Sequence, residues 1–182
     1  MEIKGNLVTL KMMTLNDIKD SIYWFTVDRE WMNWDAPWEK DEPFDPADYQ
    51  KRKELLIEKR KNEDFEPRLE IYYQDIHIGW ISRYFINESF EFDSNGKDIA
   101  IGMVIVDPKY RNHGLGSDAY LTYMNHIEKL GYKRIYTQTW SGNTPMIKLA
   151  HKTGFHLINR VKDCRMVDGV SYDALTYVKS LL

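Results

Sequence analysis

The sequence has 182 residues and a mass of 21.7 kDa, which is the size of one ordinary domain. Hydrophobic residues make up 43% and aromatic residues 14% of the chain, enough to build a core and too many for a disordered protein. The net charge of −3 gives no general reason to expect nucleic acid or an anionic membrane as a partner, so we predict neither.

Cys164 is the only cysteine, which excludes an internal disulfide and a cysteine-rich metal site. We expect no metal, and no motif supports Cys164 as a nucleophile. The first residues mix charged and apolar side chains, unlike a signal peptide, and no later stretch approaches the roughly 18 apolar residues of a membrane helix. We therefore expect a cytoplasmic protein with no membrane partner.

The spacing of apolar residues predicts an alternation of strands and helices along one domain, 1–182. In chain order the expected elements are a strand over 3–12, a helix capped by Thr14 or Asn16 and ending near Val27, a helix over 46–62, a hairpin over 69–86 turning at Gln74-Asp75, a strand over 98–107, a helix from Gly114 to Leu130, a strand over 134–140, a helix from Asn143 to Thr153, and a last hairpin over 155–180 turning at Asp168-Gly169. This order indicates a mixed sheet of class α/β or α+β.

Gly114 and Gly116 stand between an apolar strand and a helix, with Arg111 just before them. Main-chain N–H groups at a helix N-terminus favour an anion, and glycines let the backbone approach a phosphate closely. Arg111 would add charge-assisted hydrogen bonds. No Gly-Lys-Ser/Thr follows and there is no third glycine, so neither a P-loop nor a dinucleotide fingerprint fits. On these residues alone, a simple turn and a phosphate site remain equally open.

Two separated motifs nevertheless resemble the signatures of the GNAT acetyltransferase family. The first is similar to the family's acetyl-CoA motif, and its residues are Val106, Pro108, Tyr110, Arg111, Gly114 and Gly116. The second is similar to a signature in which Asn opens a helix that ends in Gly-Phe, and its residues are Asn143, Met146, Leu149, Ala150, Gly154 and Phe155. The ending RMVDGVSYDALTY resembles the subgroup acting on ribosomal-protein N-termini and small amines. The likeness covers 98–180, and the N-terminal third agrees only in element order.

The resemblance implies a GNAT fold, with a central mixed, twisted sheet of about six to seven strands and helices on both faces. It divides the chain into acceptor-side helices over about 14–62, an acetyl-CoA core over about 98–155 and a C-terminal hairpin over about 155–180. It also implies acetyl-CoA as co-substrate, with the main chain of Val104 polarising the thioester carbonyl. The residues implied to contact acetyl-CoA are Val104, Val106, Arg111, Asn112, His113, Gly114, Leu115, Gly116, Ser117 and Asn143.

Two positions depart from the family pattern. Ala150 stands where many members have a tyrosine that protonates the leaving thiolate, and Ala100 stands where a glutamate is often found. Candidate bases are Asp98, on the same strand face as Ala100, and Glu70, on the preceding hairpin. Asp98 is explained more simply as the first residue of a strand. His151 points about 100° away from position 150 on a helix, so we interpret it as a surface residue.

A tryptophan-rich and acidic segment marks the expected acceptor side. Four tryptophans lie within fifteen residues, Trp24 to Trp38, and eight acidic residues lie between positions 28 and 48. Carboxylates and indole faces suit a cationic amine, although a core of tryptophans with a solvated acidic rim is an equal interpretation. The candidate acceptor residues are Trp31, Trp34, Asp35, Tyr136 and Trp140.

These observations together predict an N-acetyltransferase that moves acetyl to a primary amine by direct attack in a ternary complex. The acceptor would be a small polycationic amine or a protein N-terminus. The alternative is a GNAT-fold regulatory module that binds an acyl-CoA with little turnover, because both usual polar positions are alanine. A plain structural domain would need both motifs to coincide by chance. The exposed-looking final hairpin is compatible with a homodimer.

Overall fold

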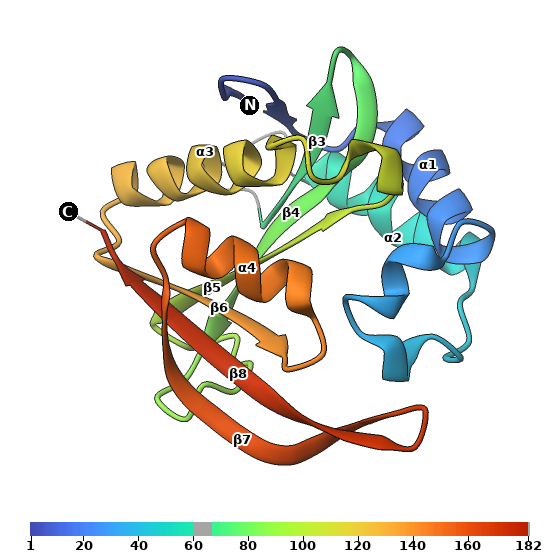
Figure 1. The fold of residues 1–182 in the computed structure, drawn as a ribbon. Coiled ribbons are helices and arrows are strands. Elements are labelled where there is room, and N and C mark those ends of the chain that lie inside the picture. The colour runs from blue at the N-terminus through green and yellow to red at the C-terminus, as the bar shows by residue number, and fades with distance from the viewer. Residues whose placement is uncertain (60–66, 182) are drawn as a thin grey trace.

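The computed structural model describes residues 1–59 and 67–181, which contain one mixed sheet of eight strands in the order β1-β2-β3-β4-β5-β6-β8-β7 (Figure 1). The strands are β1 Glu2–Lys4, β2 Thr9–Lys11, β3 Arg68–Tyr73, β4 Ile76–Ile86, β5 Asp98–Ile105, β6 Arg134–Trp140, β7 His156–Val167 and β8 Val170–Ser180. Neighbouring strands are antiparallel except β5 and β6, which are parallel. This mixed sheet confirms the predicted fold class.

Helices cover both faces of the sheet, as predicted. They are α1 Leu15–Thr26, α2 Pro46–Lys59, α3 Leu115–Lys129 and α4 Thr144–Lys152, with short 3-10 helices η1 Glu30–Asn33, η2 Pro37–Glu39 and η4 Pro108–Tyr110. Figure 1 shows α3 and α4 over one face, where Ile99 and Ile101 of β5 pack in the main core. On the opposite face, Val104 of β5 packs with Trp24 of α1. Because side chains alternate along a strand, β5 serves both layers.

The strand predicted over 3–12 is two strands, β1 and β2, and this raises the strand number to eight from the expected six to seven. The chain turns between them, where the Gly5 N–H donates to the Val8 carbonyl at 2.8 Å. The helix predicted over 46–62 begins at Pro46 as expected and is described to Lys59, and the rest of that prediction lies outside the described residues.

Local signals placed the other elements correctly. Thr14, one of the two caps that the sequence offered, caps α1, and Asp17 completes a reciprocal capping box with it. Both hairpins turn at the expected residues, with positive φ at Gln74, Asp75 and Asp168. Asn143 caps α4 through its side-chain oxygen, which accepts from the Met146 N–H at 3.1 Å. These elements are fixed within a few residues of sequence, which is why they could be predicted.

The parallel pair of β5 and β6 is registered at one position only, Ala100 with Tyr136. Beyond it the two strands diverge, while each keeps its antiparallel neighbour on the other side. β5 then ends, and the chain passes through η4 to Gly114, whose left-handed φ of 83° leads into α3. The gap between β5 and β6 therefore lies next to the N-terminus of α3.

Asp118 joins the turn between β1 and β2 to α3. Its carboxylate accepts main-chain N–H bonds from Asn6, Leu7 and Val8 at 3.1, 2.7 and 3.0 Å. Burial acts to raise the pKa of Asp118, but these hydrogen bonds outweigh it and lower the pKa. One charged acceptor thus fixes the chain reversal that makes two strands out of the predicted one.

We expect Asp118→Ala to lower the free energy of unfolding by about 2–3 kcal/mol, because three main-chain donors lose a charged acceptor. Urea denaturation followed by circular dichroism measures this loss. Glu54→Ala, at an exposed position of α2, is the control and should change stability by less than about 0.5 kcal/mol. Equal effects of the two substitutions would contradict the anchoring role of Asp118.

Candidate functional site

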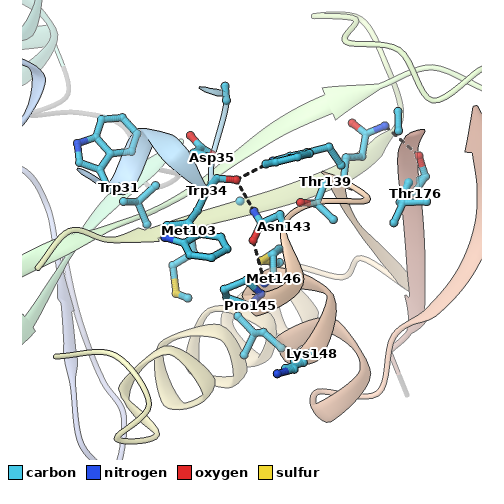
Figure 2. Close-up of a pocket in the computed structure, with 18 of the residues that line it drawn as sticks. Trp31, Trp34, Asp35, Met103, Thr139, Asn143, Pro145, Met146, Lys148 and Thr176 are labelled. Atoms are coloured by element: carbon cyan, nitrogen blue, oxygen red, sulfur yellow. Dashed lines mark hydrogen bonds between the residues drawn. The ribbon is translucent and has the colours of Figure 1, made fainter. Parts of the chain in front are cut away.

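A cleft of about 1250 Å³ opens where β5 and β6 diverge. Its lining comes from the ends of both strands, from the beginning of α3, from α4, and from the segment 30–39 that contains η1 and η2. We call residues 30–39 the strap. Figure 2 shows residues of the strap beside those of β5 and α4 around this cleft. The cleft therefore joins the two faces of the sheet through the gap between the strands.

The beginning of α3 forms an anion-binding geometry at one end of the cleft. Gly114, Gly116 and Ser117 line it, and the first turn of a helix presents N–H groups that have no partner within the helix. A Cβ on Gly116 would stand 3.1 Å from Cε of Met103, so the glycine keeps this end open. Negative charge is favoured here by the main chain itself.

Most of the residues proposed for the acetyl-CoA site line this cleft. Those that do are Val104, Arg111, Asn112, Gly114, Gly116, Ser117 and Asn143. The side chains of Val106 and Leu115 are instead buried in the two cores, and His113 is exposed on the loop. For these three residues, only the main chain is placed where it could contact acetyl-CoA.

The Arg111 side chain has partners that the sequence did not indicate. Its Nε donates to the Ile105 carbonyl at 2.9 Å, and its Nη2 bonds the Val106 carbonyl and pairs with Glu30 of the strap at 2.7 Å. Burial acts to raise the pKa of Glu30, but Arg111 chiefly lowers it. Arg111 therefore ties the strap to the end of β5, and the anion geometry belongs to the main chain of the loop.

The strap is held on its other side by two donors that share one acceptor. The Trp34 carbonyl accepts from Trp140 Nε1 at 2.8 Å and from Asn143 Nδ2 at 2.7 Å (Figure 2). Asn143 is 7% exposed. Its amide nitrogen donates to the strap, while its amide oxygen caps α4. The strap thus spans the cleft from Arg111 to Trp140.

A polar chain crosses the sheet beneath the strap. Tyr84 of β4 donates to Gln138 Oε1 of β6 at 2.9 Å, although β5 lies between these strands. Ala100 is the cross-strand partner of Tyr84, and Gly102 is the next β5 residue on that face. These small residues leave room for the tyrosine to reach over β5. The chain continues from Gln138 to Thr176 at 3.2 Å.

Asp35 of the strap is an exposed residue that lines the same cleft as this polar chain. Desolvation by the surrounding protein, followed by the charge of Glu39, raises the pKa of Asp35 to about 6, and exposure to solvent weakens this effect. Burial and the negative charge of Asp35 also raise the pKa of Tyr84, which keeps that hydroxyl protonated.

Three of the candidate residues lie away from the cleft. Asp98 stands at the beginning of β5 and pairs with Arg134 at 3.3 Å. Tyr136 is 4% exposed and packs in a cluster with Ala100, Tyr84 and Phe90, but it does not line the cleft. Glu70 is fully buried on β3 and belongs to a separate charged cluster. Of the acceptor candidates, the cleft brings together Trp31, Trp34, Asp35 and Trp140.

A buried charged cluster provides partners for the carboxylate of Glu70, which lies within strand β3. Glu70 pairs with Arg68 at 2.7 Å and with His77 Nε2 at 3.0 Å. The other ring nitrogen of His77 lies 2.9 Å from Asp20 and 3.3 Å from Asp17. In the described part of the chain, Asp17, Asp20 and His77 form a group with ligand atoms within 4.8 Å of one another. Hydrogen bonds already use these atoms, so we assign them a structural role that joins α1 to β3 and β4.

We expect His77 to stabilise the fold most strongly at low pH. Burial acts to lower the pKa of His77, but Glu70, Asp20 and Asp17 outweigh it and raise the pKa. The stabilisation is then complete below the unfolded value of about 6.5 and is lost as the pH rises through the folded pKa. The loss of unfolding free energy in His77→Gln should therefore shrink from pH 5 to pH 9.

Urea denaturation at each pH measures this difference between His77→Gln and the wild type. His156→Gln, at an exposed position, provides the matched control and should give a small effect at every pH. A pH-independent loss in His77→Gln would contradict the assignment of a charged histidine in the cluster.

Comparison with known families and structures identifies the architecture around this cleft. Residues 26–155, well over half of the chain, match the model of the family described as Acetyltransferase (GNAT) family. The chain belongs to the GNAT acetyltransferase family. A comparison with curated proteins gave no match. Among the described residues, no helix is long and apolar enough to cross a membrane.

Solved structures of other GNAT members share this fold at low sequence identity. An acetyltransferase from Salmonella typhimurium that modifies the N-terminal serine of a ribosomal protein has a TM-score of 0.76 at 15% identity, covering 100% of both chains. RimL, a ribosomal α-N-protein acetyltransferase in complex with coenzyme A, has a TM-score of 0.77 at 16% identity, covering 100% of this chain and 98% of that one. The microcin C7 self-immunity acetyltransferase MccE, in complex with acetyl-CoA and AMP, has a TM-score of 0.71 at 19% identity, covering 97% and 94%.

Proposed function

We propose that this GNAT protein is an acetyl-CoA-dependent N-acetyltransferase whose acceptor is a cationic primary amine, either a small polyamine or a protein N-terminus. The observation that carries the proposal is a single cleft with two different ends. One end is the beginning of α3, and the other is an acidic and aromatic strap on the opposite face of the sheet. Coenzyme A and acetyl-CoA bound to proteins of the same fold support the assignment of the first end to the donor.

The donor end fits the anionic and amide groups of an acyl-CoA. Main-chain N–H groups of 112–117 would hold the pyrophosphate, with Gly116 leaving room for it. The edge of β5 that turns away from β6 beyond Ala100 would pair with the amides of the pantetheine arm. When bound, acetyl-CoA supplies an activated acyl group as a thioester. The main chain at Val104 would polarise its carbonyl and stabilise the oxyanion.

The acceptor end fits a positive charge. Asp35, Glu39 and Glu91 line it together with the indoles of Trp38 and Trp140. An indole face adds about 0.5–2 kcal/mol of cation–π energy. An example lies within the protein, because the Arg165 guanidinium stands 4.9 Å from the ring centre of Trp38. A cationic amine entering from the strap side would meet the thioester at the gap between the strands. After the reacting ammonium group has lost a proton to solvent, proximity would promote attack by the neutral amine.

The proposal includes a cytoplasmic location and a homodimer formed through the C-terminal hairpin. β7 lies at the edge of the sheet and exposes apolar side chains, among them Leu157, Val161 and Met166. An exposed edge strand of this length is suited to pairing with another strand. Light scattering after size exclusion distinguishes a dimer from a monomer.

A second candidate is a GNAT module that binds an acyl-CoA without efficient turnover. It is favoured by Ala100 and Ala150, which are both fully buried where many family members carry polar groups. The two candidates differ in thiol release. We would incubate the protein with acetyl-CoA and a panel of polyamines, aminoglycosides and N-terminal peptides, following free thiol and the product mass. Acceptor-dependent release supports the transferase, whereas acetyl-CoA binding without release supports the module.

Gly116→Glu should weaken acetyl-CoA binding about 100-fold or more, because the new carboxylate would stand beside the pyrophosphate at the beginning of α3. Isothermal titration calorimetry measures the affinity, and circular dichroism verifies the fold. Leu121→Glu adds the same charge at an exposed position of α3 and should leave the affinity unchanged. Unchanged affinity in Gly116→Glu would place the anion site elsewhere.

A further inference from the structure

We propose that the hydroxyl of Thr139 is a catalytic group of the transfer, donating a hydrogen bond to the thioester sulfur as this sulfur becomes the leaving thiolate. The inference rests on the proposed function and deepens it, because it names the group that stabilises the departing thiolate. The feature that points to it is a hydroxyl without a partner in the described part of the chain, at the level where β5 and β6 have parted.

The register of β5 and β6 places Thr139 at the gap between the two strands. The one registered pair is Ala100 with Tyr136, so counting three residues along both parallel strands brings Met103 level with Thr139. Val104, whose main chain is proposed to polarise the thioester carbonyl, follows Met103 directly. Both Met103 and Thr139 line the cleft, and Figure 2 shows them among the residues around it. Thr139 therefore stands opposite the part of β5 where the thioester would lie.

Thr137, two residues earlier, shows what a threonine on this face of β6 does while the strands are still close. Its Oγ1 donates across to the Ile101 carbonyl of β5 at 2.9 Å, and it accepts from the Tyr120 hydroxyl at 2.7 Å. Side chains two residues apart lie on the same face of a strand, so Thr139 continues this row. Beyond the parting of the strands the row has no such carbonyl. Among the described residues, Oγ1 of Thr139 has no hydrogen-bond partner.

This unpartnered oxygen destabilises the folded chain by itself. It is shielded from solvent, although the residue as a whole is only partly buried. A shielded hydroxyl without a partner is unfavourable, and a valine of the same shape would avoid that cost. The cost is offset when a ligand in the cleft accepts a hydrogen bond from the hydroxyl. Thr139 is therefore suited to a ligand and not to the stability of the sheet.

Thr139 is also the hydroxyl that lies at the gap on the face covered by α3 and α4. Its cross-strand neighbour on β8 is Leu175, which packs in the main core with Ala150 of α4, a residue that carries no donor. In the part of the chain that the structure describes, the hydroxyl-bearing residues that line the cleft are Tyr84, Ser89, Ser117, Thr139 and Thr176.

The other four hydroxyls are placed for different contacts. Tyr84 donates to Gln138, and Thr176 accepts from the same amide. Ser89 is exposed on the loop between β4 and β5, and Ser117 belongs to the first turn of α3, at the anion-binding end. Thr139 is left as the hydroxyl beside the reacting atoms.

Met103 is the movable side chain at the level of Thr139. It is partly buried against the main core, and its Cε would stand 3.1 Å from a Cβ on Gly116, which places it beside the first turn of α3. A methionine side chain has three rotatable bonds and repacks readily. The thioether of Met103 can therefore move aside for an extended ligand along β5, and this movement opens the way to the Thr139 hydroxyl.

The proposed step balances with the donor, the acceptor and water. The neutral amine forms the nitrogen–carbon bond, the carbon–sulfur bond breaks, and its electron pair leaves with the sulfur. The Thr139 hydroxyl keeps its own proton, because an alcohol is a much weaker acid than a thiol. It stabilises the new negative charge by a charge-assisted hydrogen bond. The nitrogen releases its extra proton to water, and the thiolate takes a proton from water.

The first test measures the acid dissociation constant of the thiol of bound coenzyme A. The ultraviolet absorbance of the thiolate is followed in an alkaline titration, with the desulfo-coenzyme A complex as the reference, so that Cys164 contributes equally to both. We expect this constant to be about tenfold larger in the wild type than in Thr139→Val, because the hydroxyl stabilises the thiolate. Thr139→Ser keeps the hydroxyl and should behave like the wild type.

The second test compares kcat with an acceptor found by the release assay. We expect kcat to fall about 10-fold in Thr139→Val, while the acetyl-CoA affinity measured by calorimetry stays within about threefold of the wild type. Thr139→Ser should restore kcat. Thr26→Val removes an exposed hydroxyl at the end of α1 and is the matched control, with wild-type values in both tests. Urea denaturation should find Thr139→Val no less stable than the wild type.

The possible failures are distinguishable. Equal thiol constants in the wild type and Thr139→Val, or a Thr139→Ser variant as impaired as Thr139→Val, would overturn the contact with sulfur and leave the proposed function standing in an active wild type. A destabilised Thr139→Val would show a structural role and contradict the inference. A wild type that binds acetyl-CoA but transfers to no amine would overturn the proposed function and the catalytic role, whereas a tenfold difference in the thiol constant would still support the contact.

Discussion

The early end of the ladder between β5 and β6 is the constraint on which the rest of the site depends. The two parallel strands meet in register at Ala100 and Tyr136 and then part. Parting leaves main-chain groups that need partners, and a buried group without one is costly. The protein supplies some of them itself: the Ile101 carbonyl accepts from Thr137 Oγ1 at 2.9 Å, and the Ile105 carbonyl accepts from Arg111. In the proposed function, the middle of β5 would pair with the amide groups of the donor.

The strap closes the other side of the cleft, where we propose that the acceptor binds. Its two attachments differ in chemistry. At one end, Glu30 forms an ion pair with Arg111. At the other end, the Trp34 carbonyl accepts hydrogen bonds from two neutral donors. Between them Trp31 packs into the core with Trp80 at a ring separation of 5.0 Å. The tryptophans of this segment therefore do both things that the sequence left open: some fill the core and others line the cleft.

Local chemistry could be predicted from the sequence, and long-range partnerships could not. The capping box at Thr14, the turn at Asp168-Gly169 and the glycine loop at Gly114 each depend on a few adjacent residues. The division of 3–12 into two strands depends on Asp118, more than a hundred residues away. Glu70 was a candidate base because the sequence does not show that it pairs with His77 in the folded protein.

The importance of Ala100 also became clear only in three dimensions. In the sequence it marks a missing glutamate, whereas in the structure it is the space over which Tyr84 reaches Gln138. The register of β4 against β5 decides this contact, and no pattern of apolar residues fixes register to that degree. Asp35 was identified among the acceptor residues by composition, but its relation to Tyr84 required the fold.

Asn143 has a consequence for how this site can diversify. A single amide group begins α4 and anchors the acceptor wall, so any replacement that reshapes the wall at this point also weakens a helix. In the proposed enzyme, substitutions that alter the choice of acceptor would therefore cost least stability where the strap is not anchored, along η2 and the β4–β5 loop.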